Sequence, residues 1–156
     1  DAVLAVAFVD ESQVVGGYFG GDIRRWRIED GQQQGQTLNA GDPILSIAVS
    51  QDGRWIVSGD RGKKATVWNA ATHERVSDTE CESAEYGIFA VDISSDCTKF
   101  VAASLDGADN VRMFGIPSGT PLLPPLSHSW IYGVKFCPDG SRFATASETG
   151  VRIYST

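Results

Sequence analysis

One pattern of residues returns four times along the 156-residue chain, at intervals of about 43 residues. Each unit opens with a short, mostly apolar segment, found at residues 5–8, 46–49, 90–93 and 133–136. An aspartate follows each segment: Asp10, Asp52, Asp96 and Asp139. An aromatic residue stands near the end of each unit: Trp26, Trp68, Phe114 and Tyr154. Three landmarks that keep the same phase predict a chain built from four copies of one unit, because a fixed period of 20–50 residues indicates a repeat architecture.

The second unit shows what one copy contains. Four strands are expected in it, at residues 44–50, 55–59, 64–69 and 72–79. The first alternates apolar and small residues, the second is rich in β-branched and aromatic side chains, and the fourth is polar like many edge strands. Turns with Asp and Gly join them, and no stretch has the apolar period of a helix. Four short strands per unit of 40–45 residues predict the blades of a β-propeller.

Three segments carry a family pattern: VKFCPDGSRFATAS at 134–147, IAVSQDG at 47–53 and TVWN at 66–69. In these segments the chain resembles the WD-repeat β-propellers, closely in units 2 and 4 and mainly through phase in units 1 and 3. The resemblance implies an all-β fold of four-stranded antiparallel blades, the last without its outer strand. The expected blades are residues 1–41, 42–84, 85–127 and 128–156.

The units depart from the family pattern at its signature positions. The namesake Trp-Asp pair is replaced in all four: Trp26-Arg27, Trp68-Asn69, Phe114-Gly115 and Tyr154-Ser155. The family's Asp before the third strand is replaced by Phe19 in unit 1 and Arg61 in unit 2, and only His128 stands near a family His. We therefore expect the family's hydrogen-bond network to be missing in all four units, with apolar packing between blades supplying the stability.

Four blades are about half of the seven or eight that the resemblance implies for a closed ring. The chain begins on a first strand and ends after a third strand, without a spare strand to close a ring. Three interpretations stay open: a piece of a longer propeller, half of a ring completed by a second copy, and a stable open arc. An open arc would bury less surface and would leave an apolar face on each terminal blade.

Arg25 stands in a column of the third strands that is otherwise apolar, with Val67, Met113 and Ile153. A buried arginine without a partner is rare. Either the alternation slips locally and Arg25 faces solvent, or Arg25 meets an acidic group on a neighbouring blade or on a second copy. The second interpretation makes Arg25 an assembly residue.

Composition excludes several classes of partner. The net charge is −7, which argues against a general binder of nucleic acid, because such proteins carry a basic footprint. No run of about 18 apolar residues is present, so no membrane contact is expected. Cys81, Cys97 and Cys137 are odd in number and are expected to be free thiols, which favours the cytoplasm or the nucleus.

The sequence predicts no enzyme, no cofactor and no metal. The only histidines, His73 and His128, fall in different units, and no Cys or His spacing suits zinc. The Gly-rich segment 16–21 links two strands and opens no helix that would bind phosphate. Asp106 and Asp109 lie in one turn, but two carboxylates without further ligands indicate a solvated turn.

The resemblance implies one loop face, made by the loops between second and third strands and the loops that lead into each first strand. The candidate partner-binding residues on it are Tyr18, Phe19, Arg61, Lys63, Tyr86 and Trp130. Aromatic and Arg side chains are the usual anchors of binding hot spots. The alternatives are that Tyr86 and Trp130 pack between blades, that Phe19 lies on its own hairpin, and that the basic turn is only solvated.

The sequence thus favours a non-catalytic protein–protein interaction scaffold that presents loop-face residues to a peptide or protein partner. One alternative is a self-assembly module in which two copies complete one ring. Another, by analogy alone, is the sensor part of a larger signalling NTPase.

Overall fold

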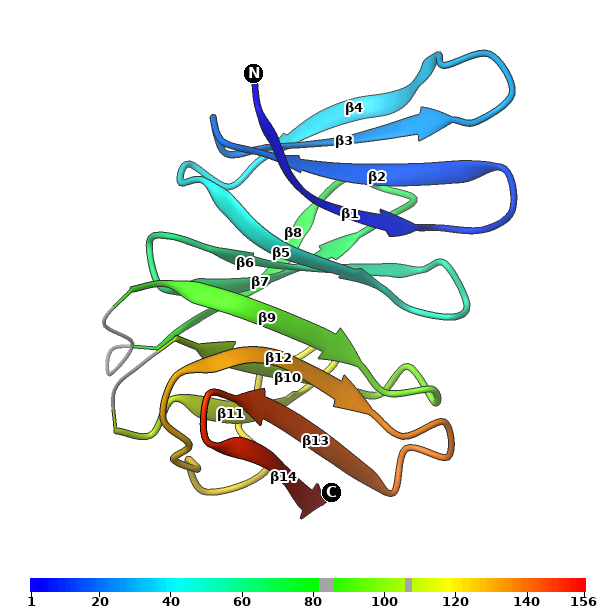
Figure 1. Cartoon of the computed structure of the whole chain (residues 1–156). Helices are drawn as coiled ribbons and strands as arrows, with labels where there is room; N and C mark the ends of the chain where they lie inside the picture. Colours follow the sequence, from blue (N-terminus) through cyan, green and yellow to red (C-terminus); the bar gives the residue numbers. More distant parts are fainter. Residues whose placement is uncertain (82–85, 106–107) are drawn as a thin grey trace.

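The computed structural model of the chain describes residues 1–81, 86–105 and 108–156 (Figure 1). In these residues the strands form four antiparallel sheets, and no helix is present. Blades 1 and 2 are β1 (Val3–Phe8), β2 (Gln13–Tyr18), β3 (Asp22–Arg27), β4 (Gln33–Asn39), β5 (Ile44–Val49), β6 (Trp55–Asp60), β7 (Lys64–Asn69) and β8 (Arg75–Glu80). Blades 3 and 4 are β9 (Ile88–Ile93), β10 (Lys99–Ser104), β11 (Val111–Gly115), β12 (Ile131–Phe136), β13 (Arg142–Ser147) and β14 (Gly150–Ser155). Strands that follow each other in the chain pair within each blade, as in a meander of hairpins.

The repeated aspartate forms the turn between the first and second strands of every blade. Its carboxylate accepts a hydrogen bond from the backbone N–H two residues later, at 2.7–3.0 Å. The four pairs are Asp10 with Ser12, Asp52 with Arg54, Asp96 with Thr98 and Asp139 with Ser141. Neighbouring hydroxyl or thiol groups also donate to these carboxylates, and together with the backbone bonds they lower the pKa of all four. The landmark is therefore a local turn device.

A Pro-rich segment, residues 117–125, takes the place of the fourth strand in blade 3. Leu122 N–H donates to the carbonyl of Met113 at 2.9 Å, and Leu126 N–H donates to the carbonyl of Val111 at 2.9 Å. Pairing along β11 is limited to such separate points, because proline has no N–H to donate. This edge of the blade is covered without a regular strand.

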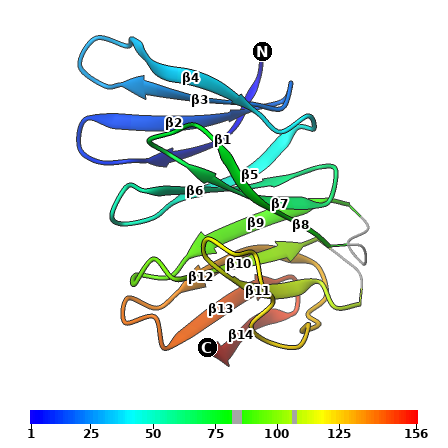
Figure 2. The same cartoon turned by 180° about the vertical axis from the view of Figure 1, so that it is seen from behind.

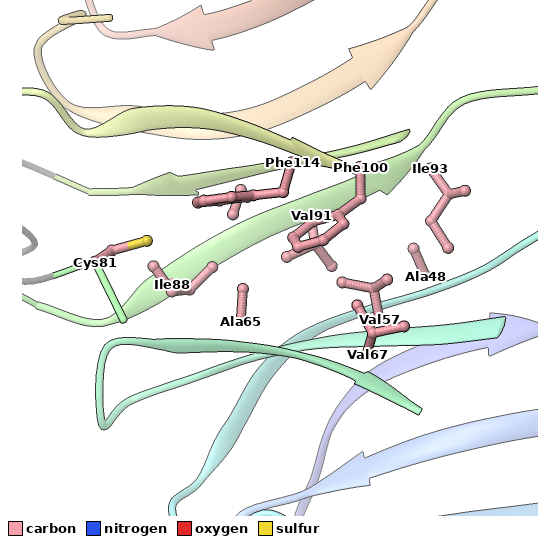
Figure 3. Close-up of a cluster of buried hydrophobic side chains, with 11 residues drawn as sticks. Ala48, Val57, Ala65, Val67, Cys81, Ile88, Val91, Ile93, Phe100 and Phe114 are labelled. Atoms are coloured by element: carbon pink, nitrogen blue, oxygen red, sulfur yellow. The ribbon is translucent and has the colours of Figure 1, made fainter. Parts of the chain in front are cut away.

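The blades lie face to face in a row, with β1–β4 at one end and β12–β14 at the other (Figures 1 and 2). The inner strands β1, β5, β9 and β12 are neighbours from blade to blade. Three apolar clusters fill the three spaces between blades. Figure 3 shows the one between blades 2 and 3, where Phe100 and Phe114 of blade 3 lie over Val57, Val67 and Ala65 of blade 2.

Each blade has two chemically different faces. We call the face toward the preceding blade the leading face, and the face toward the following blade the trailing face. The leading face of blade 2 carries the large residues Ile44, Ile47, Ile56 and Trp68. The trailing face of blade 1 has small residues on its inner strands: Ala5, Ala7 and Gly17. Large side chains of one blade therefore fill the space above small residues of the blade before it.

The row exposes no more surface than an ordinary folded domain. Its accessible area is 7600 Å², and the scaling for compact monomers gives about 7600 Å² for a chain of 16.7 kDa. The expectation that an open arc buries less surface is therefore wrong for the total area. The row differs from an ordinary domain in that its most exposed large apolar residues lie on the two terminal blades.

Two units retain polar bonds that we expected to be lost. In blade 2, Trp68 Nε1 donates to Ser58 Oγ at 2.9 Å. In blade 4, the two ring nitrogens of buried His128 lie 2.7 Å from Thr145 Oγ1 and from Ser147 Oγ. The expectation that all four units lack such a network was therefore wrong for units 2 and 4. Serine and threonine hydroxyls supply the partners where no aspartate is available, since a buried polar group needs one.

Arg25 lies between blades 1 and 2, inside the row. Its Nη2 donates to the carbonyl of Ala70 at 2.8 Å and lies 3.0 Å from His73 Nε2. The neighbouring blade supplies these partners, but they are a carbonyl and an imidazole in place of the acidic group that one of the two interpretations named. A role of Arg25 in assembly stays a prediction. In that role Arg25 would have to exchange its contacts with Ala70 and His73 for contacts with a second copy.

Candidate interaction surface

The loops at one end of the inner strands form a groove that spans blades 1 to 3. Seven residues line it: Phe19, Pro43, Leu45, Arg61, Tyr86, Phe89 and Leu105. Phe19 comes from the turn between β2 and β3, and Arg61 from the matching turn between β6 and β7. The others stand at or near the entries of β5 and β9 or directly after β10. The groove is thus built from the two kinds of loop that the resemblance implied.

A bulge in each inner strand turns one apolar residue out of the regular alternation. The pairing register shifts near the start of β1, β5, β9 and β12. The residue at each shift is Leu4, Leu45, Phe89 or Tyr132. None of the four is buried, and Leu45 and Phe89 line the groove. Bulges re-aim side chains in this way, and here they give the groove part of its apolar wall.

Close backbone contacts hold the groove loops. The N–H of Arg61 donates to the carbonyl of Pro43 at 2.9 Å. Gly87 has φ of 92°, and a Cβ there would lie 2.7 Å from the Cα of Arg61. Only glycine fits such a conformation and such an approach. These contacts fix the turn that carries Arg61 against the loops that carry Pro43 and Tyr86.

Exposed aromatic rings and one cation give the groove its chemistry. Phe19, Tyr86 and Phe89 expose 51%, 48% and 38% of their surface. Arg61 is exposed, and its side chain has no hydrogen-bond or ion-pair partner among the residues that the structure describes. Such a groove suits apolar anchors next to an acidic group of a partner.

A buried carboxylate lies directly below this surface. Asp60 exposes 1% of its area, and its Oδ1 accepts a hydrogen bond from the N–H of Lys64 at 2.9 Å. Burial raises the pKa of Asp60, and the nearby Asp42 carboxylate adds to the effect. Its carboxylate accepts backbone hydrogen bonds from its own turn, so we assign it a structural part in the β6–β7 turn.

Three of the six candidate binding residues meet in the groove: Phe19, Arg61 and Tyr86. Tyr18 does not, because its ring is buried on the leading face of blade 1, where its hydroxyl accepts a bond from Trp26 Nε1 at 3.1 Å. Lys63 lies in the same turn as Arg61 with φ of 72°, outside the groove lining. Trp130 precedes β12, is 37% exposed and also lies outside it.

Four groove residues escaped the sequence argument: Pro43, Leu45, Phe89 and Leu105. A signal for two of them is present in the sequence. Leu45 and Phe89 directly precede two of the repeated opening segments, and Leu4 and Tyr132 precede the other two. Reading this column as exposed would have required knowledge of the bulges.

The described residues offer no site for a metal. No group of three or more His, Cys, Asp or Glu side chains in residues 1–81, 86–105 and 108–156 is placed to hold an ion. Asp106 of the pair considered above lies outside the described residues. Within the same ranges no helix is long and apolar enough to span a bilayer.

Comparisons with known proteins agree with this architecture. The family model described as "WD domain, G-beta repeat" matches residues 32–69 and 120–155. Each match starts in the outer part of one blade, at β4 or in the Pro-rich segment, and continues into the next blade. No curated protein sequence matches the chain.

Two solved structures share the fold along 99% of the chain. The computationally designed Ika4 protein is 22% identical, with a TM-score of 0.81 and 91% of its own chain covered. U3-55K is 14% identical, with a TM-score of 0.83, and the chain spans 49% of its length.

The predicted family and fold class are thus confirmed. Units 2 and 4, the two that resembled the family most closely, are also those that the family model matches over their first three strands. WD repeats generally mediate contacts between proteins and are generally non-catalytic. The chain therefore carries WD repeats that are recognisable by sequence at residues 32–69 and 120–155, within a fold of four propeller blades.

Proposed function

We propose that the chain is a non-catalytic protein-interaction module whose loop-face groove binds a short peptide or an exposed loop of a partner protein. The observation that carries this proposal is the meeting of Phe19, Tyr86 and Phe89, all exposed, around the guanidinium of Arg61, which has no partner among the described residues. The four residues come from three blades, so the groove exists only in the folded row.

The chemistry of the groove favours a particular kind of segment. Aromatic and apolar walls would bury one or two apolar side chains of the partner, which is how most binding energy arises in such contacts. Arg61 would pair with a carboxylate beside these anchors. The net charge of the chain is −7, which repels an acidic partner at long range. Arg61 would attract the partner's carboxylate only at short range.

Other parts of the sequence interpretation remain compatible with this role. Cys81, Cys97 and Cys137 are free, which supports a reducing compartment such as the cytoplasm or the nucleus. Self-assembly would use the two ends of the row, which are separate from the groove. A place in a larger signalling NTPase depends on sequence outside this chain and stays a prediction.

Selection of peptides from a random displayed library on the wild-type chain would test the groove directly. Binding of the selected peptides is then compared for two variants, Phe89→Ser and Tyr132→Ser. Both residues are exposed bulge residues of inner strands, but only Phe89 lines the groove. We expect Phe89→Ser to weaken binding by at least about tenfold, since truncation of a hot-spot residue costs about 2 kcal/mol or more and about 1.4 kcal/mol corresponds to tenfold.

The control variant should bind like the wild type. Peptides with acidic residues should also lose affinity when Arg61 is replaced by Ala. Equal losses in the two serine variants, or no enriched peptide that depends on Phe89, would contradict the proposed site.

A further inference from the structure

The leading face of blade 1 repeats an interface that the chain already forms three times, but it lies open. Strand pairing places Val6 at the position held by Ile47, Val91 and Val134 in blades 2 to 4. Those three expose 8%, 7% and 9% of their surface against the preceding blade, whereas Val6 exposes 67%. Val3 and Phe8, on the same face, expose 54% and 73%.

The trailing face of blade 4 is open in the same sense. Val151 and Ile153 of β14 expose 68% and 67%. Ile153 stands at the position of Val67 and Met113, which expose 0% and 2% against the following blade. The chain therefore ends in one unused leading face and one unused trailing face.

The two open faces have complementary sizes. Inside the row, a Cβ added to Gly17 or Gly59 would come within 2.3 Å or 2.5 Å of Ile44 or Ile88 of the next blade. In the unused pair the corresponding residues are Ala146 on the trailing face and Val3 on the leading face. Ala146 and Val3 are thus a small residue and a larger one, like the pairs Gly17 with Ile44 and Gly59 with Ile88 inside the row.

One chain cannot bring these faces together by itself. They lie at opposite ends of the row, with the N-terminus at one end and the C-terminus at the other (Figures 1 and 2). Two copies related by a two-fold axis can join both pairs at once, blade 4 of each to blade 1 of its partner. Such a head-to-tail contact closes after two copies and gives eight blades, within the size range of known rings.

We propose that the two end faces bind each other between two copies of this chain. Each open face has the composition of the contact that successive blades already form, so its partner is the opposite end face of a second copy. The designed Ika4 chain, of which 91% is covered, has nearly the same extent and the same fold. The pairing uses surfaces separate from the groove and does not depend on binding there.

Analytical ultracentrifugation over a range of protein concentrations tests this pairing. We expect the 156-residue chain to sediment with twice the mass of one chain at micromolar concentration. Val6→Asp and Ile153→Asp should each weaken the dimer by at least about 100-fold, because each places an unpaired charge in both interfaces of the ring. Val76→Asp is the matched control, since Val76 is 42% exposed on the outer strand β8, away from both end faces. Circular dichroism confirms that each variant is folded.

Mixing the two end-face variants separates head-to-tail closure from other dimers. In a mixed pair, one interface carries both aspartates and the other carries none. The mixture should therefore associate more strongly than either variant alone. A wild-type chain that stays monomeric throughout overturns the proposal. Equally, a dimer broken by only one of the two variants overturns it, because that result indicates a contact between two like faces.

Discussion

Val91 and Val6 are the same residue at the same strand position of two blades, yet the first exposes 7% of its surface and the second 67%. Val91 lies between blades 2 and 3, in the cluster of Figure 3. Val6 lies on the leading face of blade 1, at one end of the row, where no other described blade packs against it. The repeat therefore specifies which positions are apolar, and only the presence of a neighbouring blade decides whether they are buried.

This comparison bears on how repeat proteins divide their stability. Each blade contributes its own hairpins and turns, and each contact between blades contributes a further amount. A terminal face has the apolar composition of a face that packs against another blade, but no blade packs against it in the described structure. The same substitution should therefore have very different effects on stability at a contact between blades and at a terminal face.

The largest difference is expected for a pair of phenylalanines. Phe136 and Phe8 stand at the same position of β12 and β1, but Phe136 exposes 8% and Phe8 73%. Phe136→Ala should lower the free energy of unfolding by about 3 kcal/mol, through lost burial and the cavity left behind. Phe8→Ala should change it by less than about 0.5 kcal/mol in dilute solution. Urea denaturation at low protein concentration measures both, and similar losses would show that the end face is packed in a single chain.

An intermediate difference is expected for a pair of glycines. A Cβ at Gly59 would lie 2.5 Å from Ile88 Cγ2 and 2.8 Å from its carbonyl oxygen, whereas a Cβ at Gly133 would meet nothing within 4 Å. Gly59→Ala should therefore destabilise the chain by about 1–3 kcal/mol through overpacking. Gly133→Ala should be neutral, or stabilising by a few tenths of a kcal/mol through the unfolded chain.

Thermal unfolding of the two alanine variants checks this second comparison. Gly133 lies on the trailing face of blade 4, so its substitution also probes the proposed ring. A variant that is stable as a monomer but dimerises less would place Gly133 in an interface. Equal destabilisation by both substitutions would contradict the contrast between closed and open faces.

The smallest effect concerns the response of two carboxyl groups to pH. Burial raises the pKa of Asp60 above its ordinary value of 3.8, so the folded state holds this proton at a pH where the unfolded state has released it. Ionised Asp60 therefore costs stability at neutral pH, and the cost fades as pH falls toward 3.8. Asp60→Asn keeps an oxygen acceptor for Lys64 N–H, so it should stabilise the chain slightly at pH 7 and not at all near pH 4.

Asp139 provides the control with the opposite sign. Hydrogen bonds from Cys137 and then from Ser141 lower the pKa of Asp139 to about 2. Its contribution to stability is complete above the ordinary value of 3.8 and is lost as pH falls from there toward 2. Asp139→Asn should therefore lose stability at pH 7, and urea titrations at several pH values measure both variants. An Asp60→Asn variant whose advantage is independent of pH would contradict the argument from burial.

The turn aspartates and the groove differ in how far the sequence could predict them. An Asx turn depends on residues within two positions, so Asp10 and its three equivalents could be placed from the sequence alone. Three of the six candidate binding residues, Phe19, Arg61 and Tyr86, line the groove, because they lie in loops that the repeat locates. Tyr18 does not line it, and its contact with Trp26 across a strand pair could not be predicted from the sequence. Phe89 was missed because a bulge reverses the side that simple alternation gives it.

The sequence by itself determined the period, the strands, the turns and the columns of apolar residues, since these depend on interactions between near neighbours. Only the tertiary structure decided what faces each column. It placed Arg25 against Ala70 and His73, gathered three blades into one groove, and left Val6 and Ile153 open at opposite ends. Burial depends on which blade lies next to which, and a repeated pattern is the same whether or not a neighbour is present.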